Sequence, residues 1–246
     1  MLRPAVKRAP WAFYALAAAL VFLFLARGAI QLPAIIDRPF FLMMQKAYLA
    51  FAFFVVVMFI GVFPEKSPVR TWLQPIRSEL SIMGCLLVIG HIVSYLVSIG
   101  ARMLANRDAY SISVQLSFLL SLLLAVLLIV LGATSFMIVR RHMRAQAWKR
   151  VQLLAYPFFL LTWVHILLYL LPPALAGSQT PLVGIIVYSA VFVAYILLRL
   201  AARGRSRKRK GGATYRGNEG RHEAAGQRNK PEIKVFLDKG STEGAI

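Results

Sequence analysis

The sequence predicts an all-α fold, a polytopic membrane bundle of about six transmembrane helices. Two observations predict this class: apolar residues make up 59% of the 246-residue chain, and charged residues make up only 15%. An ordinary soluble domain carries roughly 25% charged residues. The charges are missing from long uninterrupted stretches, which is typical of segments that are surrounded by lipid.

Six apolar runs account for these stretches. They cover residues 11–26, 42–63, 80–99, 112–139, 151–171 and 182–200. A helix needs roughly 20 residues to cross the hydrocarbon core, and most of the runs reach that length, the first being the shortest. Backbone groups in lipid must be satisfied within the segment, so runs this long indicate helices rather than barrel strands. We therefore expect a transmembrane bundle over residues 1–202.

The basic residues between the runs predict the orientation. Lys and Arg are concentrated before the first run, after the second and fourth runs and after the sixth. The connections on the other side carry fewer, namely Arg27, Arg38, Lys46, Arg102 and Arg107, and the connection at 172–181 has none. Cytoplasmic loops carry such an excess, so both ends are expected in the cytoplasm of a multi-pass protein of the inner (cytoplasmic) membrane. An alternative interpretation makes the first run a signal peptide, but Arg27 at its end favours an uncleaved span.

The chain changes character after Leu200. Residues 203–210 form a dense basic run, and the remainder to residue 246 is rich in glycine and polar residues. Because 203–246 lacks the apolar residues for a core, we expect a disordered cytoplasmic tail. Its basic run acts as a topology signal or binds anionic headgroups, and the sequence leaves both roles open. The net charge of +20 follows the positive-inside pattern, which indicates membrane lipids rather than nucleic acid as partners.

Two histidines inside apolar runs are the candidate functional residues. His91 and His165 lie in the third and fifth runs, where an ionisable residue is expensive and points to function. Counted from Glu79 and Val151 at 1.5 Å per residue, they lie roughly 18 and 21 Å deep. Two imidazoles at matched depth suit the axial positions of one haem. The single cysteine, Cys85, excludes an intrachain disulfide and a cysteine-based metal site.

The sequences that follow the two histidines are similar. His-Ile-Val-Ser-Tyr parallels His-Ile-Leu-Leu-Tyr, so Tyr95 and Tyr169 share the helix face of their histidines. They are expected to flank a macrocycle or reach a propionate, with a place in the interfacial aromatic belt as the alternative. Gly90 is expected to leave room for a flat ring, although small residues also serve helix packing.

Four short segments occur in a characteristic order. They are RSELSIMG at 77–84, GHIVSYL at 90–96, GATS at 132–135 and WKRVQLLAY at 148–156. On these segments, residues 78–171 resemble the ferric reductase-like transmembrane haem domain family, and most closely the haem-binding membrane subunits of methionine sulfoxide reductase systems. The resemblance implies that His91 and His165 are the axial ligands of haem b. Family members commonly carry a further histidine where this chain has Gln152, so one haem is expected.

The expected function is that of a membrane b-type cytochrome-like electron-transfer protein, which passes electrons toward an extracytoplasmic redox acceptor. Three donors stay open: a quinol from the bilayer, a cytosolic flavoprotein, or a flavin bound at 140–150. The alternative is a haem-free membrane scaffold or a transporter-like protein whose intramembrane histidines are structural. No Asp or Glu lies deep in any of the six runs, which speaks against proton-coupled transport.

Overall fold

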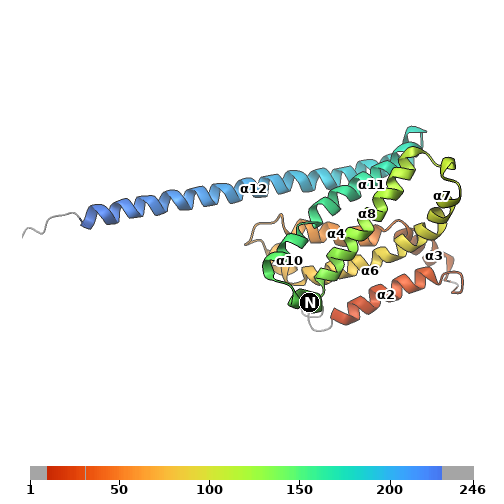
Figure 1. Ribbon diagram of the computed structural model, residues 1–246, viewed down its shortest axis with the longest axis horizontal. Helices are drawn as coiled ribbons and strands as arrows, with labels where there is room; N and C mark the ends of the chain where they lie inside the picture. The colour runs from red at the N-terminus through yellow and green to blue at the C-terminus, as the bar shows by residue number, and fades with distance from the viewer. Residues whose placement is uncertain (1–9, 31, 229–246) are drawn as a thin grey trace, which may run out of the picture. The chain divides into compact units, whose positions relative to one another are not determined.

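The structure is a computed structural model that describes residues 10–30 and 32–228, with side chains described up to residue 205. Every regular element in these residues is helical (Figure 1), which confirms the predicted all-α class. The helices are α2 (Pro10–Leu25), α3 (Ala34–Gln45), α4 (Tyr48–Ile60), α5 (Pro68–Leu73), α6 (Arg77–Tyr95), α7 (Ala101–Ala105), α8 (Ile112–Ser135), α9 (Met137–His142), α10 (Ala145–Gln152), α11 (Ala155–Leu175) and α12 (Gln179–Arg228), with 3-10 turns at Gln74–Ile76 and Arg107–Ala109 and a π-helical turn at Leu96–Gly100.

Four helical stretches in the described residues are long and apolar enough to cross a membrane. They are Pro68–Ala105, Ile112–Ser135, Ala145–Leu175 and Gln179–Arg205. The bent pair α3 and α4 counts as a fifth if it forms one span, and α2 is an apolar helix of 16 residues. The membrane class is therefore supported with four to five spans by length and composition, against the six that the sequence predicts.

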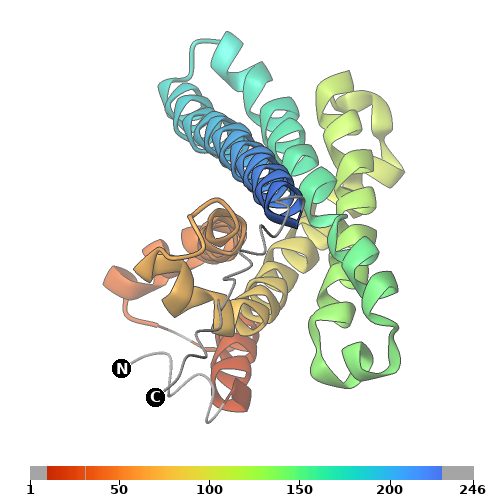
Figure 2. The same cartoon turned by 90° about the vertical axis from the view of Figure 1, so that its left-hand side faces the viewer.

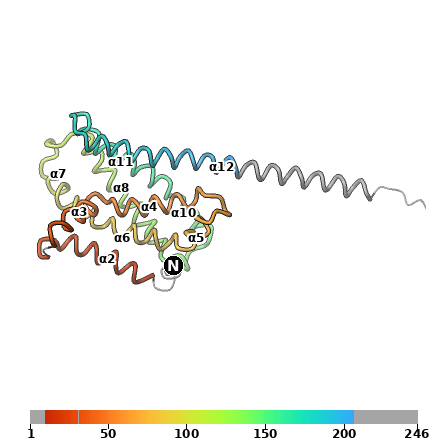
Figure 3. Tube along the Cα trace, turned by 180° about the vertical axis from the view of Figure 1, so that it is seen from behind, coloured from red at the N-terminus to blue at the C-terminus, as the bar shows by residue number. Residues whose placement is uncertain are grey.

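Helix α6 lies at the centre of the bundle. It packs against α2, α4 and α8, and Figure 3 shows it running between α2 and α4. Gly84 permits the close approach of α4, because a Cβ atom there would lie 3.0 Å from the Phe54 ring. Small residues at such contacts let helix backbones approach closely in membranes. Helix α11 packs along α8 (Figure 2). Helix α8 therefore contacts both α6 and α11, the two helices that carry the predicted histidines.

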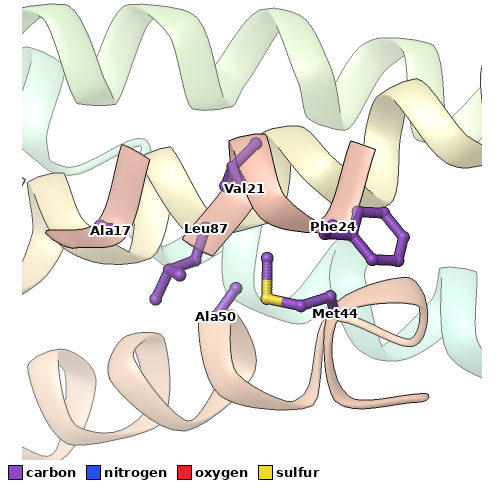
Figure 4. Packing of buried hydrophobic residues seen from close by; sticks show 6 residues of the cluster. All are labelled: Ala17, Val21, Phe24, Met44, Ala50 and Leu87. Carbon is purple, nitrogen blue, oxygen red and sulfur yellow. The ribbon is translucent and has the colours of Figure 1, made fainter. Parts of the chain in front are cut away.

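A cluster of buried apolar side chains joins α2 to the segment around α3 and α4. It consists of Ala17, Val21, Phe24, Met44, Ala50 and Leu87. In Figure 4, Met44 points from the end of α3 toward Val21 of α2, with Leu87 of α6 alongside. Contacts of this kind in lipid are stabilised mainly by van der Waals packing, since lipid tails are as apolar as the side chains.

The apolar run at 42–63, predicted as one helix, is broken in the structure. Helix α3 ends at Gln45, α4 begins at Tyr48, and their axes differ by 52°. Ala47 at the break has φ 54°, in the left-handed region that non-glycine residues rarely adopt. A break frees the last carbonyl groups of the preceding helix for other partners. This freedom matters for the site described below.

Substitutions at Ala47 should therefore change the stability of the protein according to how well the new residue tolerates a positive φ. Glycine adopts this conformation without strain, so Ala47→Gly is expected to leave stability unchanged or raise it by up to about 1 kcal/mol. Ala47→Val places a β-branched residue there and should cost about 1–3 kcal/mol. Unfolding of the detergent-purified protein by heat or by sodium dodecyl sulfate measures both. Equal stability of the two variants would contradict the left-handed assignment.

The chain divides into two compact units, Met1–Leu200 and Ala201–Ile246. In the second unit the helix that began at Gln179 continues to Arg228, although the composition of 203–246 predicts disorder. Extending an existing helix requires no new nucleation. Residues 229–246 lie outside the described part of the chain, and the disorder expected for 203–246 stays a prediction.

Candidate functional site

A cavity of 570 Å³ opens between the helices of the first unit, and both predicted histidines line it. Its walls come from α4, α6, α8, α11 and the first turns of α12. Aromatic and aliphatic side chains such as Phe51, Phe54 and Leu124 make up most of the lining. Cofactor pockets usually measure about 300–1,000 Å³ and combine apolar walls with a few polar groups. The cavity belongs to this class.

His91 is held on the cavity wall by the break between α3 and α4. Its Nδ1 atom lies 2.6 Å from the backbone carbonyl oxygen of Gln45, the last residue of α3. In a continuous helix that carbonyl would accept from Leu49, four residues on. A carbonyl only accepts, so Nδ1 of His91 carries the proton and donates it. The broken helix thus orients this imidazole.

His165 is held in the same way by α8. Its Nδ1 atom lies 3.0 Å from the backbone carbonyl oxygen of Ser117. The Ser117 hydroxyl also lies 3.0 Å from Nδ1, and it donates to the His165 carbonyl at 3.2 Å. Ser117 is 2% exposed, so this contact is sealed inside the packing of α8 against α11. The carbonyl again fixes the proton on Nδ1.

Both imidazoles therefore present Nε2 as an unprotonated nitrogen with a lone pair. Neither Nε2 atom has a hydrogen-bond partner among the described residues. A histidine that binds a metal typically donates its other N–H to a carbonyl or carboxylate, which fixes the tautomer and the ring orientation. The same arrangement occurs twice here, on two helices that face one cavity. The donor chemistry of His91 and His165 thus fits ligation of a haem iron.

Tyr95 and Tyr169 lie where the helix spacing predicts, on the cavity wall beside the histidines. The rings of His91 and Tyr95 have centroids 4.8 Å apart, and those of Tyr95 and Tyr169 lie 6.0 Å apart in an edge-to-face arrangement. These contacts connect the two histidine-bearing helices across the cavity. The structure thus brings together four of the five residues that the sequence predicts for the site.

Gly90 is the exception, and its predicted role in admitting a flat ring needs correction. It is not among the residues that line the cavity, and a Cβ atom built on it would meet Phe24 at 3.1 Å and Met44 at 3.4 Å. Successive residues of a helix point about 100° apart. Because His91 faces the cavity, its neighbour Gly90 faces α2 and α3. Its small size serves helix packing.

Several cavity residues carry no clear signal in the sequence. Lys46 and Tyr48 line the cavity from the helix break, with the Lys46 ammonium 6.0 Å from the centroid of the Tyr48 ring. Tyr188 lines it from α12 and contacts Phe51 at 5.0 Å between ring centroids. Lys46 is a charged residue inside an apolar run, and this was the only feature of the sequence that could have pointed to these cavity residues.

No group of three or more His, Cys, Asp or Glu side chains that could hold a metal ion occurs in the described part of the chain. A haem iron needs only two protein ligands, since the porphyrin supplies the other four nitrogens. A pair of histidines is therefore enough to be a candidate for haem ligation. Gln152 donates a hydrogen bond to the Thr134 hydroxyl at 3.1 Å.

Comparison with known proteins adds one relative. A protein of Treponema pallidum (strain Nichols), described as an uncharacterized protein, is 35% identical over 125 residues, which is 51% of this chain and 35% of that protein. The chain thus matches about a third of the relative's length. No family model and no solved structure matches.

Proposed function

We propose that this chain is a membrane b-type cytochrome-like electron-transfer protein that holds one haem between α6 and α11. One observation carries the proposal: His91 and His165 line the same cavity, and each has its Nδ1 proton bound to a backbone carbonyl. A purely structural histidine needs no such pairing with a second one. The family resemblance of residues 78–171 supports the same ligands.

The proposed topology has six spans in the inner membrane, with both ends in the cytoplasm. It counts α2 as a span and α3 with α4 as one bent span. The concentration of Lys and Arg at one set of connections supports this orientation. In this topology α6 and α11 both run outward, with His91 in the second half of α6 and His165 at the middle of α11, so the cavity would lie at or beyond the midplane toward the outer side.

The chain's own residues would hold the haem as follows. His91 and His165 would ligate the iron, while Phe51, Phe54 and the other apolar wall residues would exclude water from the site. Lys46 and the tyrosine hydroxyls of the cavity are the polar groups available to the propionates. Haem iron supplies reversible one-electron transfer, and the protein tunes its potential through ligation, burial and nearby charge.

The donor is proposed to be a quinol from the bilayer, a cytosolic flavoprotein, or a flavin held at 140–150, and the acceptor lies on the extracytoplasmic side. The basic residues of α9 and α10 could attract an anionic partner in the cytosol, and they equally serve to orient the chain in the membrane. Reduction of the purified protein by a quinol analogue alone would identify the first donor. Reduction only after addition of a cytosolic flavoprotein fraction or of free flavin would identify the others.

A haem-free scaffold is the alternative, with both histidines serving only as hydrogen-bond donors. The bonds to Gln45 and Ser117 support that role too, since they join α6 to α3 and α11 to α8. The two functions differ at Nε2. A scaffold has no use for two unpartnered nitrogens on one cavity, whereas a haem protein requires them.

An optical experiment tests the proposal. The protein, purified in detergent from cells supplied with a haem precursor, should show a Soret band and a sharp α-band on reduction. The pyridine hemochrome assay should give about one haem per chain. A well-folded preparation that lacks both bands, and that takes up no haem when titrated with hemin, would leave the scaffold as the function.

A further inference from the structure

Three arginines, Arg70, Arg77 and Arg199, form a cluster at the end of the bundle where α6 and α11 begin and α4 ends. Arg77 is the first residue of α6. Arg199 of α12 and Arg70 of α5 lie close enough to repel its positive charge. In the described part of the chain, Arg77 forms neither an ion pair nor a hydrogen bond. Two tyrosines, Tyr156 and Tyr195, are its other electrostatic neighbours.

Arg199 shows the same excess of positive charge. Its guanidinium donates to the Gly61 carbonyl at 2.9 Å and to the Tyr156 hydroxyl. Its Nε atom is buried and has no hydrogen-bond partner among the described residues. Partly buried cations are costly unless an anion or hydrogen bonds compensate them. The protein alone supplies too little compensation here.

A pocket of 380 Å³ opens beside this cluster, and Arg77 and Arg140 line it. The Arg140 guanidinium lies over the Trp148 ring, 4.3 Å from its centroid. No Asp or Glu occurs among the described residues that line the pocket. Serine side chains and apolar side chains such as Met58 and Leu131 also line it. A ligand that fills this pocket would therefore need an anionic group for the arginines and an apolar part for the rest of the wall.

We propose that this pocket binds the phosphate of an anionic phospholipid, with an acyl chain along its apolar wall. Arginine binds phosphate through paired N–H groups, which suits Arg77, because its donors are unused. Basic pockets between transmembrane helices on the cytoplasmic side are typical sites for such headgroups. A soluble phosphate compound would leave the apolar wall without a contact. The inference does not depend on the haem.

The test compares lipids on the full-length protein purified in dodecyl maltoside. Dioleoyl-phosphatidylglycerol should remain bound in native mass spectrometry and raise the unfolding temperature, whereas dioleoyl-phosphatidylcholine should do neither. Arg77→Gln should weaken phosphatidylglycerol binding about tenfold, as expected when a charged hydrogen-bond donor is lost. Arg102→Gln, which removes an exposed arginine of α7, is the matched control and should bind as the wild type does.

Two outcomes would overturn the proposal. One is equal binding of phosphatidylglycerol by the Arg77→Gln and Arg102→Gln variants. The other is stabilisation by inorganic phosphate as large as that by phosphatidylglycerol, which would identify a soluble phosphate site instead. If Arg77→Gln elutes as an aggregate, Arg140→Gln decides, since it changes the second arginine of the pocket and should weaken binding severalfold.

Discussion

Replacing His91 or His165 with alanine is expected to abolish the low-spin haem spectrum and to lower haem content from about one per chain to near zero. Each substitution removes one proposed iron ligand, and the described cavity lining offers no third histidine, cysteine or methionine in its place. Iron left with one protein ligand turns high-spin or is lost. The reduced α-band and the pyridine hemochrome content of the purified variants measure the change.

His142→Ala is the matched control. His142 is exposed on α9, where its Nδ1 lies 2.8 Å from the Ile138 carbonyl oxygen, and it lines neither pocket. Its replacement should leave the spectrum intact. Added imidazole should restore a low-spin band in His91→Ala if the variant keeps its fold, because alanine leaves room for the missing ring. Unchanged haem content in both His91→Ala and His165→Ala would refute the assignment.

The histidine pair was predictable because an ionisable side chain inside an apolar run has few structural explanations. The groups that orient the pair were not. Gln45 acts through its backbone carbonyl, which any residue carries, so its identity contains no signal, whereas Ser117 uses its hydroxyl as well as its carbonyl. The break that frees the Gln45 carbonyl has no glycine or proline in the residues between α3 and α4, and Pro39 lies inside α3.

Helix geometry explains both the success at Tyr95 and the failure at Gly90. Tyr95 follows His91 by four residues and returns to the same face, where the rings are in contact. Gly90 precedes His91 by one residue and points elsewhere. The class of fold followed from composition alone. The number of spans could not be predicted in this way. Helix α2 has only 16 residues, and α3 joins α4 at an angle, so length alone does not decide whether these helices cross the membrane.

Replacing Phe192 with alanine should strongly destabilise the bundle. Its side chain on α12 is fully buried, with its ring centroid 4.5 Å from that of Phe159, 5.6 Å from Trp163 and 5.8 Å from Phe51. Phe→Ala in a core costs about 3–5 kcal/mol. The lower end, about 3 kcal/mol, is expected here, because burial from lipid brings no hydrophobic transfer energy and only packing is lost.

The comparison variant is Leu197→Ala, five residues further along α12. Leu197 is 61% exposed, so its truncation removes lipid contacts and should change stability by less than about 0.5 kcal/mol. Unfolding in sodium dodecyl sulfate, followed by tryptophan fluorescence, measures both variants. A Phe192→Ala variant as stable as Leu197→Ala would mean that α12 does not pack on α11 and α4. That outcome would also remove Tyr188 of α12 from the cavity wall described above.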